Sequence, residues 1–265
     1  MVYCAQLVLL VGALAFNQYA ANFLICSIWV VAVVWKIGKW WSGSYLILLA
    51  LLTVLTLQDP FQAYRWGLIP VALVIFHVYL AIYIFSRVVR NLLSDRLSLA
   101  DLTLYMGHRV IGAYSFSKII DESSPEVVAA HNPLEVMNSS WVYSAGIVDF
   151  IVALAAPVAA YLLCRYSARP AEINAESKSA ALSPIWLLLL VALINVVGFA
   201  DFCVVGAGYS SLLLPGPFQM ENVTVSVIPM TRFPVAVLVM GLAPVSMLFH
   251  IVSVHRVVML LRKKV

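Results

Sequence analysis

An arginine and an aspartate lie inside two consecutive apolar segments, where they could form a buried ion pair or line an ion pathway. Arg109 falls near the middle of one segment and Asp149 in the outer part of the next. Ionisable side chains in the hydrocarbon region are costly and rarely face lipid, so each needs a partner within the protein. Consecutive membrane helices run antiparallel, so the arginine can reach the carboxylate. The pair is interpreted either as a structural contact between two helices or as part of a transport pathway.

Small residues accompany Asp149 along one face of its expected helix. Spacings of three and four residues connect it to Ala145, Ala153, Ala156 and Ala160. Such a stripe of small side chains allows a second helix to approach closely. The stripe therefore predicts a helix–helix contact at Asp149.

Four further polar residues are candidates for the same pathway or ion-pair network: Asp201, Asn195, Arg232 and His250. Asp201 lies near the outer end of its apolar segment, and the favoured interpretation is a carboxylate at the membrane interface. Asn195 precedes it by six residues, about 120° around a helix. If Asp201 instead shares a cavity with Asp149, the two like charges favour retention of a proton on one carboxyl, which suits proton or cation handling.

Two histidines suggest a different chemistry, the binding of haem b. His77 and His108 lie on neighbouring apolar segments, each roughly 16 Å below the outer edge, at a helical rise of about 1.5 Å per residue. Two histidines at similar depth could act as axial ligands. His250 lies deeper in the membrane, so its depth matches that of the other two histidines less well. The alternative for each histidine is a hydrogen bond inside the bundle.

The sequence contains no recognisable catalytic or metal-binding motif. H-E-x-x-H, G-x-S-x-G and P-loop patterns do not occur. The four cysteines lie in apolar segments without paired spacing, so neither a zinc site nor a disulfide framework is expected. The sequence therefore does not favour an enzyme.

The elements that must position these residues are membrane helices. Of the 265 residues, 63% are hydrophobic and 11% charged, and the mean hydropathy is +0.99. Runs without charge are long enough to cross a bilayer. We predict an all-α polytopic membrane protein with a single transmembrane domain over residues 1–265. A seven-span fold would result if the first two segments formed one long helix. Otherwise eight spans are expected, at residues 2–16, 19–35, 44–57, 67–86, 100–119, 144–165, 184–206 and 233–261.

The distribution of basic residues predicts the orientation of these spans. With eight spans and a cytoplasmic N-terminus, twelve lysines and arginines fall inside and three outside, as the positive-inside rule expects. Both termini are then cytoplasmic. The segment at 87–96 forms a basic inner loop, and the main outer loops lie near 120–140 and 207–232. The residues expected to share the cytoplasmic side are Lys36, Arg90, Arg169 and Lys263, with Glu126 and Glu221 across the membrane.

Four stretches of the chain together resemble a family of bacterial polytopic inner-membrane proteins of unknown function. They are H-R-V-I-G-A-Y (108–114), S-A-G-I-V-D-F-I-V-A-L-A-A-P-V-A (144–159), M-T-R-F-P-V (230–235) and L-F-H-I-V-S-V-H-R-V (248–257). Members of that family carry an F-R-x-x-G span, an A-G-x-G-D span and a C-terminal L-H-x-x-S-L-x-x-L span. This chain has His108 where the family has an aromatic residue before the arginine, and its loop at 120–143 is longer. The resemblance implies that Arg109, Asp149 and His250 matter, and it implies no activity.

We therefore expect a multi-pass protein of the bacterial inner (plasma) membrane with one of three functions. The favoured function is a pathway for a small solute, an ion or protons, opening outward and lined by Arg109, Asp149, Asp201 and Asn195. One alternative is a haem-binding redox subunit, and another is a non-catalytic subunit of a larger membrane complex. Expected partners are the lipid bilayer and, for the last alternative, other membrane-protein subunits. Nothing in the sequence indicates nucleic acid.

Overall fold

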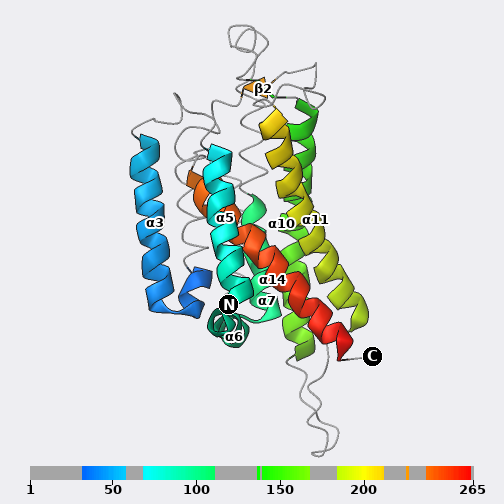
Figure 1. Ribbon diagram of the computed structural model, residues 1–265. Helices are drawn as coiled ribbons and strands as arrows, with labels where there is room; N and C mark the ends of the chain where they lie inside the picture. Colours follow the sequence, from blue (N-terminus) through cyan, green and yellow to red (C-terminus); the bar gives the residue numbers. More distant parts are fainter. Residues whose placement is uncertain are drawn as a thin grey trace, which may run out of the picture.

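The computed structural model describes residues 32–57, 68–110, 136–137, 139–167, 184–211, 225–226 and 237–263. Apart from two short strands, the elements in this part of the chain are helices (Figure 1). Residues 32–37 are also helical. In chain order the named helices are α3 (Lys39–Leu57), α5 (Leu68–Phe85), α6 (Arg87–Arg96), α7 (Leu99–Tyr105), the 3-10 helix η2 (Met106–Arg109), α10 (Ser139–Ser167), α11 (Ile185–Ser211), the π-helix η4 (Leu238–Leu242) and α14 (Ala243–Arg262).

Several of these helices are long and apolar enough to cross a membrane. Within the described ranges they are Lys39–Leu57, Gly146–Tyr166, Ile185–Cys203 and Val239–Arg262. A fifth span results if α5 and α6, which meet at a bend of 93°, are counted together. The predicted helical architecture is confirmed to this extent. The count of eight stays a prediction, because most of the first two predicted spans and half of the fifth lie outside the described residues.

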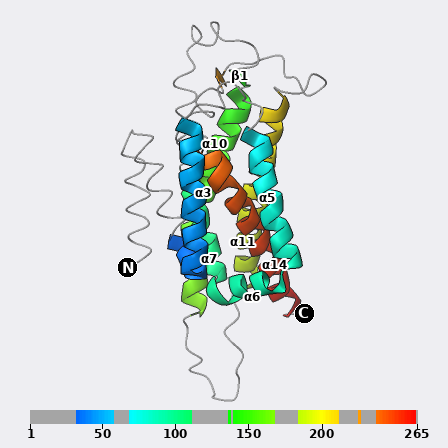
Figure 2. The ribbon, with the colours of Figure 1, turned by 60° about the vertical axis from the view of Figure 1, so that its left-hand side comes forward.

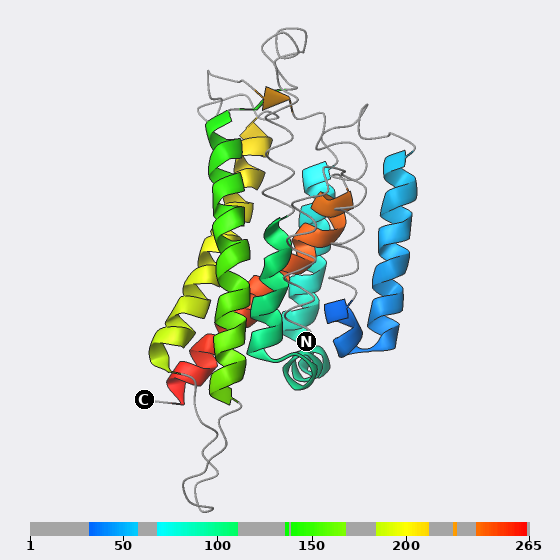
Figure 3. The same ribbon diagram turned by 180° about the vertical axis from the view of Figure 1, so that it is seen from behind.

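Helices α10, α11 and α14 form the centre of the bundle. Helix α10 contacts α11, α7 and η2, while α14 contacts α11, α7 and α5. Figure 1 shows α14 crossing the bundle diagonally, and Figure 3 shows α7 beside α10. Among the described elements, helix α3 lies at one side of the bundle in Figure 1 and contacts η4. The core therefore lies where α7 and η2 pack among the three central helices.

The predicted stripe of small residues on α10 is confirmed for its described members. Ala153, Ala156 and Ala160 are completely buried, and Asp149 is buried on the same face. Alanine side chains allow close approach, and α7, η2 and α11 pack against this helix. Sequence spacing thus identified the surface of α10 on which Asp149 meets its partners.

The fifth predicted span departs from a regular α-helix at its centre. A capping box starts α7, with the Asp101 amide donating to Ser98 Oγ at 3.0 Å and the Ser98 amide donating to Asp101 Oδ2 at 2.9 Å. After Tyr105 the chain tightens into η2, which ends at Arg109. A 3-10 turn within a longer helical stretch often marks a functional position or strain. Here it carries two of the predicted site residues, His108 and Arg109.

The predicted basic loop at 87–96 is wrong, because this segment forms helix α6. Ser86 is its N-cap and accepts a hydrogen bond from the Val89 amide at 3.3 Å. Its apolar residues recur at helical spacing, with Leu93 buried against the bundle while Arg87 and Arg96 are exposed. Figure 2 shows α6 lying across the lower end of the bundle. This is the form of an interfacial amphipathic helix.

Several predicted spans are shorter than the helices that the structure shows. Helix α3 begins at Lys39 and not at Ser44, α10 covers 139–167, and α11 continues to Ser211. Hydropathy marks the apolar core of a span, whereas the helix itself extends into the polar interface where backbone groups can still bond internally. Strands β1 (Val136–Met137) and β2 (Val225–Ser226) pair antiparallel, which joins the two predicted outer loops.

The helix ends that carry basic residues gather at one end of the bundle. The start of α3, all of α6, and the ends of α10 and α14 lie at the lower end in Figure 1. Arg90 belongs to α6, while Lys36 lies shortly before α3 and Lys263 directly after α14, so these three lie at one end of the bundle. Arg169, Glu126 and Glu221 lie outside the described residues, and so does Arg232.

Candidate functional site

Arg109 lies at the centre of a buried cluster that joins η2 to α10 and α11. Its Nε donates to Asp149 Oδ1 on α10 at 2.5 Å, and its Nη2 donates to Asp201 Oδ2 on α11 at 2.8 Å. The third nitrogen, Nη1, donates to the backbone oxygen of Gly198 at 2.8 Å. The guanidinium also lies 4.3 Å from the ring centre of Phe202, a cation–π distance. All three nitrogens of the arginine are thus engaged, as a buried guanidinium requires.

The predicted ion pair between Arg109 and Asp149 is present, but it has a third member. The interfacial interpretation of Asp201 is wrong, because its side chain is only 5% exposed and binds the same guanidinium. Arg109 and Asp149 are similarly buried, at 2% and 7%. Since α11 continues ten residues beyond Asp201, that carboxylate lies within the helix and not at its end. One arginine therefore serves two carboxylates from two helices.

Gly198 permits this arrangement by having no side chain. A Cβ at this position would lie 2.8 Å from His250 Nε2 and 3.0 Å from Arg109 Nη1, closer than carbon atoms can normally approach. The glycine lies three residues after Asn195 and three before Asp201, so all three residues occupy neighbouring positions on one side of α11. The site thus needs a glycine as much as it needs the charged residues.

His250 extends the cluster towards α14. It is completely buried, and its Nδ1 lies 3.0 Å from Asn195 Oδ1. The amide of Asn195 is oriented by the bond from its Nδ2 to Val191 O at 2.8 Å, so its oxygen faces the histidine. The proton of the neutral imidazole therefore lies on Nδ1, and Nε2 presents a lone pair. Within the described part of the chain, Nε2 has no hydrogen-bond partner.

A second polar network lies beside the first, between α7, η2 and α14. Ser246 Oγ lies 3.2 Å from the Tyr105 hydroxyl and 2.9 Å from His108 Nε2, while His108 Nδ1 lies 2.5 Å from the Tyr105 carbonyl oxygen. Because a carbonyl oxygen can only accept, Nδ1 of His108 carries the proton. Both ring nitrogens of this histidine are therefore engaged by protein atoms.

The structure does not bring His77 and His108 together as a ligand pair. His77 is on an exposed part of α5, and its Nδ1 bonds to Leu73 O of the same helix at 2.7 Å. His108 is buried at the centre of the bundle with both nitrogens occupied. The prediction that the two histidines lie at similar depth assumed a regular α-helix over 100–119. The 3-10 helix η2 instead changes the direction of the His108 side chain. The haem hypothesis accordingly has no geometric support in the described residues.

Sequence reasoning missed four residues of the site: Gly198, Phe202, Tyr105 and Ser246. A signal for Ser246 was available, because Ser246, His250 and Ser253 are spaced by four and three residues and lie on one buried face of α14. The other three carry no charge and no unusual spacing, so only the packed structure identifies them.

The described residues contain no group of three or more histidine, cysteine, aspartate or glutamate side chains that could hold a metal ion. The cluster instead combines one cation with two carboxylates and a histidine, all hydrogen-bonded within the protein interior. Such a set can hold an ion pair or exchange protons.

Comparisons with protein-family models, with curated proteins and with solved structures find no match to this chain. The resemblance to a bacterial inner-membrane family therefore stays a prediction, and the function must be argued from the geometry of the site.

Proposed function

We propose that this protein is a proton pathway of the bacterial inner membrane, centred on Arg109, Asp149 and Asp201. The proposal includes eight spans and two cytoplasmic termini, with the basic end of the bundle towards the cytoplasm. The observation that carries it is that two buried carboxylates share one buried guanidinium. Intramembrane ionisable residues that face the bundle interior are typical of proton relays.

The charge count of the cluster favours proton exchange. With all three groups ionised, Arg109 neutralises one carboxylate and a surplus negative charge remains in the interior, where an uncompensated charge is expensive. One proton on either carboxyl removes the surplus. Because Arg109 contacts both Asp149 and Asp201, the arginine keeps an ionised partner whichever of them holds the proton. The cluster can therefore load and release one proton without leaving the guanidinium unpaired.

The buried face of α14 offers a route from the cluster towards the basic end of the bundle. His250 Nε2 presents a lone pair beside Gly198, which Arg109 also contacts. Ser253, almost one turn further along α14, is completely buried, and its Oγ has no hydrogen-bond partner among the described residues. His255 is exposed and lies about 200° around the helix from Ser253, so it does not belong to this face. Two buried polar groups, His250 and Ser253, thus lie along this face in the direction of the C-terminal end of α14.

A structural clamp is the competing function, and one observation favours it. Every nitrogen of the Arg109 side chain already donates to a protein oxygen, so the cluster could serve only to hold η2, α10 and α11 together. Such a clamp suits a non-catalytic subunit of a larger membrane complex. The two functions differ in whether the protein conducts protons.

A vesicle assay separates them. The purified protein is reconstituted into liposomes that contain a pH-sensitive dye, and a potassium diffusion potential drives protons across the membrane. We expect proton flux above that of empty liposomes for the wild type, and flux at the level of empty liposomes for Asp149→Asn and Asp201→Asn. The matched control is Asp95→Asn, the same chemical change at an exposed position on α6, which should keep the wild-type flux.

Two results would overturn the proposal. Wild-type liposomes that conduct no more than empty ones would leave the clamp as the function. Flux that is unchanged in folded Asp149→Asn and Asp201→Asn proteins would show that protons do not pass through the cluster.

A further inference from the structure

Ser246 on α14 bonds to the residue that precedes Arg109 in the chain. Its Oγ lies 2.9 Å from His108 Nε2, and His108 and Arg109 are neighbours in η2. Ser246 is completely buried, and His108 nearly so. The serine is also the only polar side chain in the first two turns of α14, from Ala243 to Phe249. It therefore connects α14 to the turn that carries the arginine.

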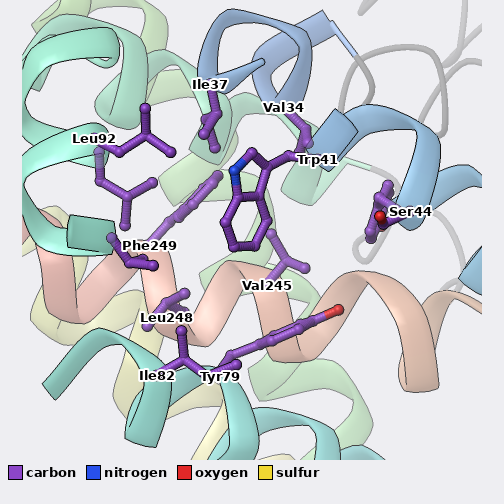
Figure 4. A pocket seen from close by; sticks show the side chains of 13 residues that line it. Val34, Ile37, Trp41, Ser44, Tyr79, Ile82, Leu92, Val245, Leu248 and Phe249 are labelled. Carbon is purple, nitrogen blue, oxygen red and sulfur yellow. The ribbon is translucent and has the colours of Figure 1, made fainter. Parts of the chain in front are cut away.

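The adjacent face of α14 is apolar. Val245, Leu248 and Phe249 line an apolar pocket on that side of the helix, as Figure 4 shows. Ser246 lies about 100° around the helix from Val245, and it is not among the residues that line the pocket. The hydroxyl of Ser246 thus faces η2 and not the pocket.

The hydrogen bonds of Ser246 have a defined direction. Nδ1 of His108 carries a proton because it bonds to the carbonyl oxygen of Tyr105, so Nε2 of the neutral ring can only accept. The Ser246 hydroxyl therefore donates to His108 Nε2, and the Tyr105 hydroxyl donates to Ser246 Oγ at 3.2 Å. Leu242 O, at 3.0 Å, lies within reach of the same serine proton. An apolar side chain at position 246 would remove this donor from His108.

His108 in turn holds the tight geometry of η2. Its Nδ1 reaches the Tyr105 carbonyl oxygen three residues earlier, at 2.5 Å, which is the residue spacing of a 3-10 turn. From Met106 to Arg109 a 3-10 helix turns through about 360°, whereas an α-helix turns through about 300°. A return to α-helical geometry would therefore rotate the Arg109 side chain by about 60° around the helix axis.

Such a rotation would move Arg109 away from its acceptors. The guanidinium reaches Asp149 on α10 and Asp201 on α11. His108, the preceding residue, faces Ser246 on α14. The 3-10 turn thus divides two adjacent residues between two sides of the bundle. Arg109 lies on the side of α10 and α11 only while the turn is kept.

We propose that Ser246 is a positioning residue, which holds Arg109 between the two carboxylates through His108 and the 3-10 turn. Loss of the Ser246 hydroxyl frees the His108 ring, relaxes η2 and lets the guanidinium leave its acceptors. That the positioned arginine serves proton transfer rests on the proposed function, whereas the positioning itself does not.

Nitrogen NMR of the full-length protein with labelled arginine tests the positioning directly. In the wild type, Nη1 and Nη2 of Arg109 bond to different acceptors, Gly198 O and Asp201 Oδ2, so they should give two separate signals. Arg109→Gln identifies these signals by their loss. In Ser246→Ala the guanidinium should rotate, and the two signals should merge into one.

Ser253→Ala is the matched control, because it makes the same change at a completely buried serine seven residues further along the same face of α14. It should keep two separate signals. Ser246→Thr retains the hydroxyl and should also keep them. If Ser246→Ala does not fold, Ser246→Cys takes its place, because a thiol is a much weaker donor, and its two signals should likewise merge.

Proton flux in the liposome assay gives a second readout, which depends on the proposed function. Ser246→Ala should lower the flux roughly fivefold, as expected for the loss of one hydrogen bond, and Ser246→Thr should restore it. Merged signals in Ser246→Ala together with no flux in the wild type would refute the proton pathway and support the positioning. Two separate signals in Ser246→Ala, or merged signals in Ser253→Ala or in the wild type, would overturn the positioning role.

Discussion

Gly198 is the position where one added methyl group tests the geometry of the charged cluster. The change Gly198→Ala introduces a Cβ that would lie 2.8 Å from His250 Nε2 and 3.0 Å from Arg109 Nη1. Neither neighbour can easily move away. His250 is completely buried and held by Asn195, and Arg109 is held by three hydrogen bonds. The added carbon must therefore displace groups that are already fixed.

Three effects determine how much Gly198→Ala should change the free energy of unfolding. Overpacking a tight interior costs about 1–3 kcal/mol. Displacement of Arg109 also weakens its bond to Gly198 O, and hydrogen bonds to charged groups contribute about 1.5–3 kcal/mol. In the opposite direction, alanine is better than glycine in a helix interior by about 1 kcal/mol. We expect Gly198→Ala to lower the free energy of unfolding by about 1.5–5 kcal/mol, the upper end applying if the bond to Gly198 O is lost entirely.

Gly43→Ala on α3 is the matched control, because no atom of the described residues lies within 4 Å of its added Cβ. Only the better helix propensity of alanine should then act, so Gly43→Ala should raise the free energy of unfolding by up to about 1 kcal/mol. The assay is thermal unfolding of both variants and the wild type in the same detergent. The two substitutions should shift the midpoint in opposite directions. A Gly198→Ala protein as stable as Gly43→Ala would refute the close packing of Gly198 against His250 and Arg109.

The remaining predictions concern the polar groups. Arg109→Gln should lower the free energy of unfolding by about 3–5 kcal/mol, because it leaves two carboxylates unpaired. Adding Asp149→Asn should restore part of this loss. Strictly additive effects of the two substitutions in chemical denaturation would show that Arg109 and Asp149 do not interact. Asp201→Ala should lower the unfolding midpoint, because it removes the oxygen that accepts from Arg109, whereas exposed Asp95→Ala should not, and equal midpoints would place Asp201 outside the cluster. Nitrogen NMR of selectively labelled His250 should show a proton on Nδ1, and a proton on Nε2 would contradict the orientation of Asn195.

Burial cost and small-residue spacing were sufficient to predict the contact between Arg109 and Asp149. A charged side chain in an apolar segment needs a partner, and the alanines of α10 indicated the face on which the partner lies. Both arguments depend only on local sequence. They hold because the bilayer leaves a buried charge few alternatives.

The role of Asp201 could not be obtained in this way. Its assignment to the interface depended on where the seventh span ends, and hydropathy does not locate the end of a helix that continues to Ser211. Likewise, the proposed pairing of His77 with His108 depended on a regular helix through residues 106–109, which are a 3-10 turn. In both cases the error came from geometry that depends on packing between helices and not on composition.

Asp201, the third member of the cluster, helps to decide between a proton pathway and a structural clamp. A clamp needs one carboxylate for one arginine, and Asp149 already supplies it. A second buried carboxylate adds negative charge that Arg109 cannot neutralise, so on stability alone an amide at position 201 would hold the same guanidinium at lower cost. The surplus charge is explained if the site must take up a proton, because a neutral Arg–Asp pair has no reason to bind one. The lone pair of His250, buried beside the same glycine without a partner in the described residues, gives that proton a next acceptor. The surplus charge of the cluster and the orientation of the His250 lone pair thus both favour proton exchange over a static ion pair.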